Sequence, residues 1–338
     1  MPRQSVVIDA MGGDIGIDVT VPASILSLRK HPKLNIILVG DEALINTKLD
    51  QLGELNNKRI TVHHSTEVVL MDESPQSAMK NKKDSSMRVS LNMVKEGKAL
   101  ACVSAGNTGA LMATARFVLK MLPGIDRPAI ASFLPNQKNK TTCMLDLGAN
   151  SDCTAQQLLQ FAVMGAMLTT ALFNKKNPSV GLLNIGSEEI KGTEVVKEAY
   201  DLLRQSHLNF FGNIEGDDIF KGTTDVVVTD GFVGNIALKT TEGLAHMLRN
   251  FLKQEYKKNV LTKVMALISL PVLRAFRRRV DPRRYNGASF LGLNGIVVKS
   301  HGGTDIFGFS CAIEAAIHEM ENKILDKIKK QLKIEHIA

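Results

Sequence analysis

The chain has 338 residues, of which 44% are apolar and 22% charged, and its formal net charge at pH 7 is +8. A chain of this length and composition can bury a large core, as one α/β unit or as two domains, so a disordered protein is excluded. Residues 1–5 contain no apolar segment of the kind found in signal peptides, and we expect none.

The positive charge is concentrated in one segment. Phe251–Arg284 contains ten Lys or Arg residues against Glu255 and Asp281, a net +8 (10 − 2), so the rest of the chain sums to zero. Aromatic residues make up only 5% of the chain and tryptophan is absent, so the stacking platforms of nucleic-acid binders are missing. We therefore expect no nucleic-acid partner. We predict that the basic segment, residues 251–284, is an inserted helical hairpin.

The four cysteines form no C-x-x-C pair and no metal-ligand spacing. Cys102 and Cys143 stand inside apolar runs, where a thiol behaves as a small hydrophobic group. We expect all four to be structural, no metal site, a reducing compartment and hence a cytoplasmic protein.

Seven short apolar runs end in polar turns, and predicted helices separate many of them. The runs begin at Val6, Leu34, Ala99, Thr141, Val180, Asp225 and Gly295, and the helices are expected over 86–96, 109–120, 154–173, 192–203, 235–258 and 310–332. This alternation predicts a mostly parallel sheet covered on both faces, a three-layer α/β/α sandwich in a single α/β domain over residues 1–338. Six of the turns, all except that after the Leu34 run, are rich in glycine. Because carboxyl ends of parallel strands face a common crevice, we expect these six turns to converge.

The first turn, VVIDAMGGD, contains Asp9, Gly12, Gly13 and Asp14. A dinucleotide site needs G-x-G-x-x-G at the start of a helix, whereas here the glycines are adjacent and two carboxylates would repel a pyrophosphate. The sequence thus excludes a dinucleotide fingerprint at this turn. A plain tight turn and the crevice of another ligand both remain open.

The segment SAGNTGALMA places Asn107, Thr108 and Gly109 at the start of an apolar helix. Free N–H groups and the helix dipole make such a start a phosphate site. Ordinary N-capping explains the same residues equally well.

Later turns contain polar residues suited to binding an anion. Lys191, in NIGSEEIKG, is either a point charge for phosphate or a solvated surface lysine. Asn235 opens a helix, and its amide can donate to an oxyanion. His301, followed by Gly302, is the one histidine of eight at a strand-end glycine turn.

The basic segment has an apolar centre. Ten uncharged residues lie between Lys263 and Arg274, which is too short to span a bilayer. An apolar tip flanked by cations suits a hairpin lying on an anionic membrane surface, and we assign this contact to Leu270, Pro271, Val272, Leu273, Arg277 and Arg278. A hairpin packed against a second copy of the chain is the alternative, and both can hold. The arginines also suit an acidic protein partner.

Seven motifs together resemble the phosphate acyltransferase (PlsX) family. They are DAMGGD, SAGNTGALMA, IDRPAI, LDLGANSDC, LLNIGSEEIKG, TDGFVGNIALKTTEG and YNGASFLGLNGIVVKSHG, in order from Val6 to about Ile317. The resemblance implies a fold similar to isopropylmalate dehydrogenase and transfer of a fatty acyl group from acyl carrier protein to inorganic phosphate, giving acyl phosphate. Many members have a histidine directly after GGD, where this chain has Ile15. A general base at that place is therefore not expected.

The resemblance also implies partners and a location. Family members are homodimers without a metal or nucleotide cofactor. They are peripheral at the inner face of the plasma membrane, where a downstream acyl-phosphate:glycerol-3-phosphate acyltransferase uses the product. We expect the same of this protein.

The expected reaction assigns roles to the polar turns. Phosphate, with a second pKa near roughly 6, is largely dianionic at neutral pH and needs no strong base, and the chain has no G-x-S-x-G nucleophile elbow. We expect Lys191 and the Asn107–Thr108 helix start to hold phosphate, Asn235 to stabilise the oxyanion, and His301 to donate to phosphate or to the leaving sulfur. Orienting and substrate-binding roles are expected for Asp9, Gly12, Gly13, Asp14, Gly109, Asp146, Asn150, Asp230 and Gly302.

Two other enzyme classes stay open. A short-chain phosphate acetyl- or butyryltransferase would use coenzyme A thioesters. A decarboxylating dehydrogenase of the same fold would need a divalent metal between paired aspartates and an arginine cluster, and neither is evident near the glycine turns.

Overall fold

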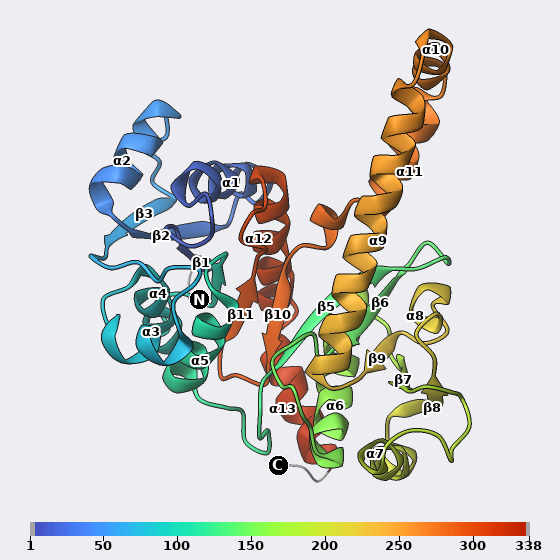
Figure 1. Ribbon diagram of the computed structural model, residues 1–338. Helices are drawn as coiled ribbons and strands as arrows, with labels where there is room; N and C mark the ends of the chain where they lie inside the picture. Colours follow the sequence, from blue (N-terminus) through green and yellow to red (C-terminus); the bar gives the residue numbers. More distant parts are fainter. Residues whose placement is uncertain (1–3, 336–338) are drawn as a thin grey trace.

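The computed structural model describes residues 4–335, and the side chains of Arg277 and Val280 lie outside the described part. Eleven strands form one sheet in the order β3-β2-β1-β4-β11-β10-β5-β6-β9-β7-β8 (Figure 1). The strands are β1 Ser5–Asp9, β2 Asn35–Gly40, β3 Ile60–His64, β4 Ala101–Ser104, β5 Ala129–Pro135, β6 Thr141–Leu145, β7 Ser179–Leu183, β8 Asn209–Ile214, β9 Val226–Val228, β10 Ala288–Leu291 and β11 Ile296–Lys299.

Two antiparallel strands divide this sheet into two parallel parts. β1, β2, β3, β4 and β11 pair in parallel. β10 pairs antiparallel with β11 and β5, and β5 pairs antiparallel with β6. β6, β7, β8 and β9 are parallel to one another but run opposite to the first part. The six glycine turns therefore follow strands of two directions, which corrects the expectation that they share one end of one parallel sheet.

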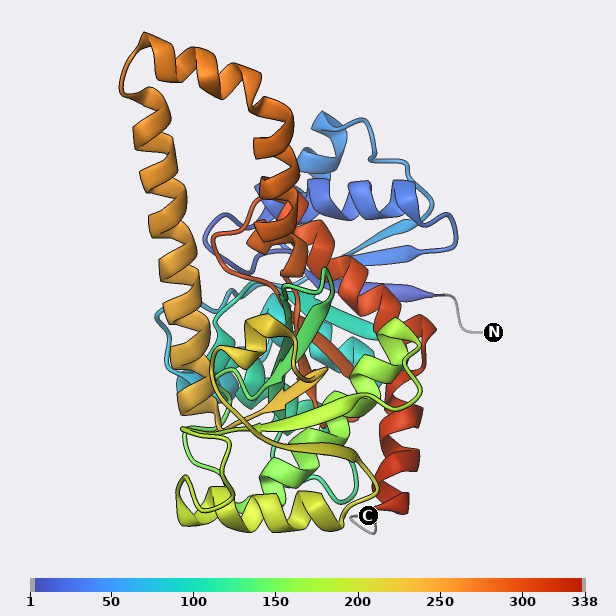
Figure 2. The same ribbon diagram turned by 90° about the vertical axis from the view of Figure 1, so that its right-hand side faces the viewer.

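Helices cover both faces of the sheet (Figures 1 and 2). One apolar core lies under the first helix layer, which comprises α1 Ile17–Lys30, α2 Glu42–Gln51, α6 Ala155–Phe173, α7 Glu194–Gln205, α12 Ile306–Glu321 and α13 Ile324–Ile334. A second core lies under the opposite layer, which comprises α3 Pro75–Asn81, α4 Ser86–Lys95, α5 Thr108–Leu119, α8 Asp218–Lys221 and the start of α9 Gly231–Lys257. The predicted three-layer α/β/α sandwich is confirmed.

Helix α6 is apolar on all sides because it lies in the core. It starts with a capping box between Thr154 and Gln157. Among the described residues it is the one helix long and apolar enough to cross a membrane, and 72% of that stretch is buried inside the protein. Burial against the sheet accounts for its composition.

The helix expected over 310–332 is two helices. α12 ends at Glu321, and α13 begins after Lys323, whose φ of 51° is left-handed. Ile317 and Ile324 are both buried in the same core. The apolar pattern therefore continues across the break and does not reveal it.

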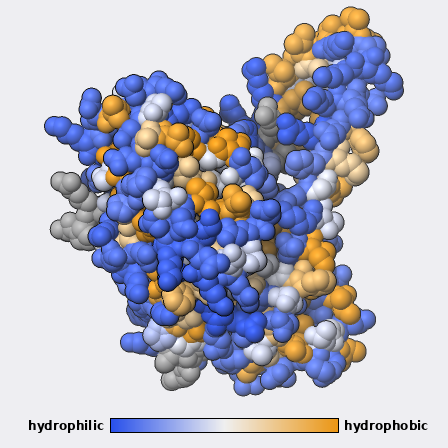
Figure 3. All heavy atoms as spheres, turned by 60° about the vertical axis from the view of Figure 1, so that its left-hand side comes forward, coloured by the Kyte–Doolittle hydropathy of each residue, from blue (hydrophilic) through white to orange (hydrophobic). Residues whose placement is uncertain are grey.

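The segment from Gly231 to Tyr285 forms a protruding arm (Figures 1 and 2). α9 rises from the sheet, α10 Val260–Ile268 forms the outer end, and α11 Leu270–Val280 returns to the 3-10 helix η1 Pro282–Tyr285. The arm is longer than the hairpin expected over 251–284, because α9 begins at Gly231. Apolar atoms gather at its outer end in Figure 3.

Candidate active site

Asp9, at the end of β1, is a buried carboxylate that joins three elements. It is 1% exposed and accepts hydrogen bonds of 2.6 Å from Ser86 Oγ of α4 and of 2.6 Å from Ser104 Oγ of β4. Burial raises its pKa above the ordinary value, and the two hydroxyl donors oppose that rise. Asp9 therefore lies beneath the turns, where it positions them.

The turns after β1, β4 and β11 pack on one another, and we call them the β1 cluster. A Cβ added at Gly12 would lie 2.6 Å from Asp9 Oδ2 and 2.9 Å from Gly106 N, and one at Gly13 would lie 2.9 Å from Gly302 O. Only glycine permits such close approach of the backbones. Three of the six predicted turns thus meet at one place.

The exposed groups of the β1 cluster lie above Asp9. The Asp14 N–H donates to Gly302 O at 3.0 Å, and a Cβ added at Gly302 would lie 3.3 Å from Asp14 Oδ1. Asp14, Thr108 and Gly109 are exposed. The cluster therefore presents a carboxylate and the N-terminal backbone of α5 to solvent.

Asn107 is occupied by structural contacts. Its Oδ1 accepts from the Ala110 N–H at 3.0 Å, and its Nδ2 donates to Met71 O at 2.7 Å and Glu73 O at 3.0 Å. Its side chain caps α5 and tethers the loop before α3. At this helix start, N-capping by Asn107 and an open backbone at Thr108 and Gly109 occur together.

Lys299, the last residue of β11, is a buried cation that the sequence analysis missed. It is 8% exposed, and its Nζ donates to Ala105 O at 3.2 Å and also to Ser300 O. Burial lowers the pKa of Lys299 to about 8, the nearby Lys239 ammonium lowers it too, and Asp9 and Asp14 oppose this. A lysine inside an apolar strand run, directly before a glycine turn, was the signal available in the sequence.

His301 follows Lys299 by two residues and is exposed. Its backbone N–H donates to Asn286 Oδ1 at 3.0 Å, and its Nδ1 accepts from the Gly303 N–H at 3.2 Å. Because Nδ1 is an acceptor in this geometry, we infer that the neutral ring carries its proton on Nε2. His301 can therefore donate from Nε2 to a ligand over the β1 cluster.

A second group, the β6 cluster, joins the turn after β6 to the start of α9. Asp146 is fully buried: its Oδ1 accepts from Ile130 N at 2.9 Å and Ala149 N at 3.1 Å, and its Oδ2 accepts from the Asn150 N–H at 2.8 Å and Nδ2 at 2.9 Å. Burial raises its pKa and these donors oppose the rise. Asp146 is thus fully engaged in holding its own turn.

The start of α9 is fixed on the β6 cluster. Asp230 Oδ1 caps the helix by accepting from the Val233 N–H at 2.8 Å. A Cβ added at Gly234 would lie only 1.8 Å from Asp146 O, so the helix backbone rests directly on that carbonyl. Asn235, the next residue, is exposed, and a Cβ added at Gly148 would lie 3.5 Å from its Oδ1. Asp146 and Asp230 thereby position Asn235.

Helix α9 also carries a charge that acts on the β1 cluster. Lys239 lies four residues after Asn235, so both are on the same side of the helix. The charge of Lys239 acts on Lys299 of the β1 cluster. Asn235 therefore shares its side of α9 with a lysine whose charge helps to lower the pKa of Lys299.

Lys191 lies in a separate turn after β7. It is exposed, its N–H donates to Glu188 O at 3.1 Å, and its carbonyl accepts from Asn184 Nδ2 at 3.1 Å. The contacts described for it stay within its own loop, and that loop follows β7 at the same end of the parallel β6, β9 and β7 strands as the β6 cluster. Over residues 4–335, no group of three or more His, Cys, Asp or Glu side chains has the arrangement of a metal site.

Comparisons with known proteins identify the family. The family model described as fatty acid synthesis protein matches residues 4–327. A phosphate acyltransferase of Chromobacterium violaceum is 60% identical over 332 residues, which cover 97% of this chain and 96% of that protein. One of Methylococcus capsulatus is 55% identical over 328 residues, with coverage of 97% and 96%.

Solved structures support the fold. A phosphotransacetylase from Streptococcus pyogenes aligns with a TM-score of 0.64 at 18% identity, over 94% of each chain. The EutD phosphotransacetylase from Staphylococcus aureus aligns with a TM-score of 0.62 at 17% identity, again over 94% of each chain. At these identities the likeness shows the fold alone. The resemblance predicted from the seven motifs is confirmed, and the chain belongs to the fatty acid synthesis protein family in which these phosphate acyltransferases stand.

Proposed function

We propose that this protein is an acyltransferase that moves a long-chain fatty acyl group from acyl carrier protein to inorganic phosphate, giving acyl phosphate for phospholipid synthesis. The observation that carries the proposal is 60% identity, over 97% of the chain, to a protein named phosphate acyltransferase. The family description as fatty acid synthesis proteins supports a fatty acyl substrate.

The β1 cluster suits phosphate. The exposed Thr108 and Gly109 stand at the positive end of the α5 dipole, where anions bind. Lys299 adds positive charge beneath the turns, and His301 Nε2 is a donor beside them. Asp14 is an anion in the same place, so we assign it the orientation of donors and not contact with phosphate oxygen.

The β6 cluster suits the thioester. A phosphate oxygen attacks the carbonyl carbon, the carbonyl oxygen becomes an oxyanion, and the C–S bond then breaks to release the thiolate. We assign to Asn235, which is exposed at the start of α9, the donation of a hydrogen bond from Nδ2 to that oxyanion. His301 or water protonates the departing sulfur. Positioning two bound reactants supplies much of the rate.

We also propose that the arm anchors a homodimer at the cytoplasmic face of the membrane. The exposed apolar surface is centred on α10, where Val260 is 77% and Ile268 is 75% exposed. Of the tip residues expected from the sequence, Pro271 and Val272 are exposed, whereas Leu270 and Leu273 are half-buried. Arg278 is exposed beside them and suits anionic headgroups, and the side chain of Arg277 lies outside the described part.

The outer half of α9, between the body and α10, supports self-association. α9 leaves several large apolar side chains exposed along its outer half, namely Leu244, Met247, Leu248, Phe251 and Leu252. Contiguous apolar surface of this kind is typical of protein–protein contact. A second copy of the chain would cover it while α10 remains free for lipid. Acyl carrier protein and the downstream acyltransferase are the other partners we propose.

Acyl phosphate formation by the purified protein tests the proposed function. We expect product from inorganic phosphate and palmitoyl acyl carrier protein. Product from acetyl or butyryl coenzyme A instead would favour the short-chain phosphotransacylase, whose fold this chain shares. A folded protein that forms no acyl phosphate from any donor would contradict the proposal and reopen the dehydrogenase alternative.

A further inference from the structure

A surface depression of about 300 Å³ lies at the foot of the arm, where α11, η1 and the start of α12 meet. Four arginines and one aspartate contribute to its lining, which gives it a net charge of +3 (4 − 1). Part of the basic segment is thus gathered around one hollow. The lining residues are Arg274, Arg278, Asp281, Arg283, Arg284 and Phe307.

Arg283 is the one arginine of the depression that is held by carboxylates of the described residues. It donates to Asp281 from Nε at 2.9 Å and from Nη2 at 2.6 Å, and its Nη1 donates to Asp305 Oδ2 at 2.6 Å. Its guanidinium also lies over the Phe307 ring, 5.2 Å from the centroid. Arg283 is therefore fixed, and with Asp305 included the group still has a net charge of +2 (4 − 2).

The other three arginines are available to a ligand. Within residues 4–335, the structure gives Arg274, Arg278 and Arg284 no carboxylate partner, and all three are exposed. Arg274 and Arg278 are about one turn apart on α11, so they lie on the same side of the helix. The guanidinium of Arg284 lies 5.5 Å from the Phe307 centroid. The depression therefore offers three guanidinium groups to an anion that comes from outside.

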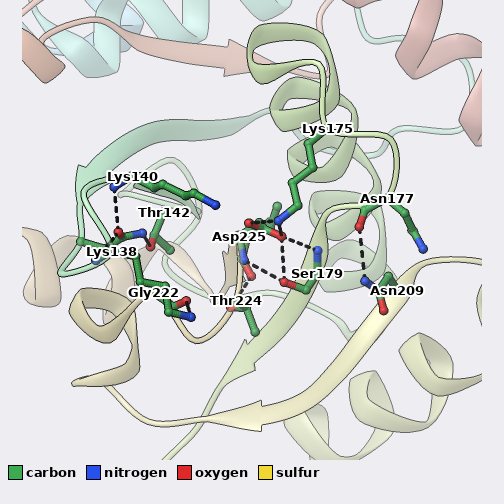
Figure 4. Close-up of polar contacts among 12 residues, drawn as sticks. Lys138, Lys140, Thr142, Lys175, Asn177, Ser179, Asn209, Gly222, Thr224 and Asp225 are labelled. Carbon is green, nitrogen blue, oxygen red and sulfur yellow. Dashed lines mark hydrogen bonds and ion pairs between the residues drawn. The ribbon is translucent and has the colours of Figure 1, made fainter.

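Two lysines of the body show the contrast. Lys175 Nζ, in the loop before β7, donates to the two carboxylate oxygens of Asp225 at 2.5 Å and 2.6 Å (Figure 4). Lys138 Nζ, in the β5–β6 turn, donates to Gly222 O at 2.7 Å (Figure 4). These two cations hold neighbouring loops together, whereas the three arginines of the depression have no such contact among the described residues.

The depression adjoins the β1 cluster. Asn286 directly follows η1, and its side chain accepts from the His301 N–H at 3.0 Å and donates to Ser300 Oγ at 2.8 Å. Asp305, which binds Arg283, caps α12 four residues after His301. Hydrogen bonds thus join the elements around the depression to the turn that presents His301.

An acidic protein surface and an anionic lipid both suit this charge, and the position favours the protein. Arg278 lies eight residues after Leu270, roughly 12 Å along α11 from the outer end of the arm. Arg284 lies farther, because α11 returns toward the body (Figure 2). Exposed charges separated by more than the Debye length, about 8 Å at physiological ionic strength, are largely screened from one another. Lipid bound at α10 would therefore leave the depression free for a soluble partner.

We propose that this depression docks an acidic surface of the carrier protein that delivers the acyl donor. The inference rests on the proposed function and adds to it the surface that receives the donor. Two observations carry it: three guanidinium groups without a carboxylate partner line one depression, and hydrogen bonds join the elements around it to the His301 turn.

Charge reversal inside and beside the depression tests the docking. Arg278→Glu and Arg284→Glu change lining residues, and Arg279→Glu makes the same change at an exposed arginine of α11 that does not line the depression. We expect the Kd for holo acyl carrier protein, measured by fluorescence anisotropy, to rise about tenfold in each of the first two, because attractive charge pairs become repulsive. In Arg279→Glu it should change by less than about twofold.

Two further measurements separate docking from a general loss of activity. The wild-type affinity for the carrier protein should fall as the salt concentration rises. In assays with palmitoyl acyl carrier protein, Arg278→Glu and Arg284→Glu should raise KM by the same factor as Kd and leave kcat unchanged, because they act on docking and not on the chemical step.

The binding measurement needs no turnover, so it is independent of the proposed function. If wild type forms no acyl phosphate but both lining variants weaken carrier binding, the proposed function fails and the docking surface stands. Equal or undetectable carrier binding by all four proteins would overturn the inference, whatever their activity. Loss of flotation with anionic vesicles in the lining variants, with carrier binding unchanged, would assign these arginines to lipid and overturn it as well.

Discussion

The body of the protein, which is the sheet with the helices packed on it, buries carboxylates, whereas the arm exposes large apolar side chains. In the body, the carboxylates of Asp9 and Asp146 are buried and supplied with several hydrogen-bond donors each. On the arm, large apolar side chains such as Val260 and Ile268 are exposed. α9 belongs to both, because its first turn rests on Asp146 and its outer half leaves the body. We therefore assign the proposed chemistry and the proposed association to separable regions.

Among the variants proposed here, Lys299→Met should lower enzymatic activity the most. Loss of the buried charge lowers kcat/KM for phosphate by about a hundredfold to a thousandfold. Wild-type activity should fall above pH about 8, because Lys299 is charged below its lowered pKa and neutral above it. The variant should not show this fall in activity at high pH. The pH–rate profiles of the wild type and of Lys299→Met measure the difference. Lys176→Met, at an exposed lysine, is the control, and an unchanged profile in folded Lys299→Met would refute the role.

Asn235→Ala should reduce turnover on the order of a hundredfold, because one oxyanion donor is lost. Steady-state assays at saturating phosphate isolate this effect in kcat. The same assay on Lys191→Ala tests the phosphate role predicted from the sequence, which the structure places in a separate loop. Near-normal turnover in folded Asn235→Ala would remove it from the mechanism.

Two glycines of α9 sharpen the comparison between body and arm. Gly234→Ala places a methyl group 1.8 Å from Asp146 O, so α9 must shift, and misplacement of Asn235 costs activity on the order of a hundredfold. Gly243→Ala meets nothing within 4 Å and should raise the stability of the chain by about 0.5–1 kcal/mol without loss of activity. Activity assays and thermal melts distinguish them, and equal behaviour of the two would contradict the packing described.

Glu319 gives the body a pH-dependent stability. Burial raises the pKa of this α12 carboxyl to about 7, against the Ser289 hydroxyl donor that lowers it. The folded protein thus holds a proton that the unfolded chain loses above pH about 4.5, so stability falls as pH rises from there to about 7, by about 3 kcal/mol. Glu319→Gln should flatten this dependence in melts between pH 5 and 8. Glu321→Gln, exposed on the same helix, should not.

Leu267→Glu should have the smallest effect on chemistry and a clear effect on association. The side chain is 69% exposed on α10, so turnover with soluble substrates is unchanged, whereas flotation with anionic vesicles is lost. Leu44→Glu, on the α2 surface at 49% exposure, is the matched control. Equal flotation of all three proteins would show that α10 is not the anchor.

Much of the body could be predicted from the sequence. Continuous apolar runs such as those before Asp9 and Asp146 form strands because both faces of the sheet are covered, and the helices between them follow their apolar stripes. The reversal of the sheet could not be predicted, because β10 pairs with β5, more than 150 residues away, and no local pattern encodes that choice.

The site was only partly predictable. The close packing of the turns brings together five of the predicted residues, Asp9, Gly12, Gly13, Asp14 and Gly302. Lys299 was missed because its strand reads as apolar, and the start of α9 was placed late because Gly231 and Gly234 disfavour a helix in isolation. The two glycines are explained by tertiary packing, since both contact the Asp146–Asn150 turn.

A crystal structure with bound inorganic phosphate would test the central claim most directly. The account predicts phosphate at the backbone N–H groups of Thr108 and Gly109 and within hydrogen-bond distance of His301 Nε2. Phosphate bound at the Lys191 loop, with the β1 cluster empty at the same concentration, would contradict it.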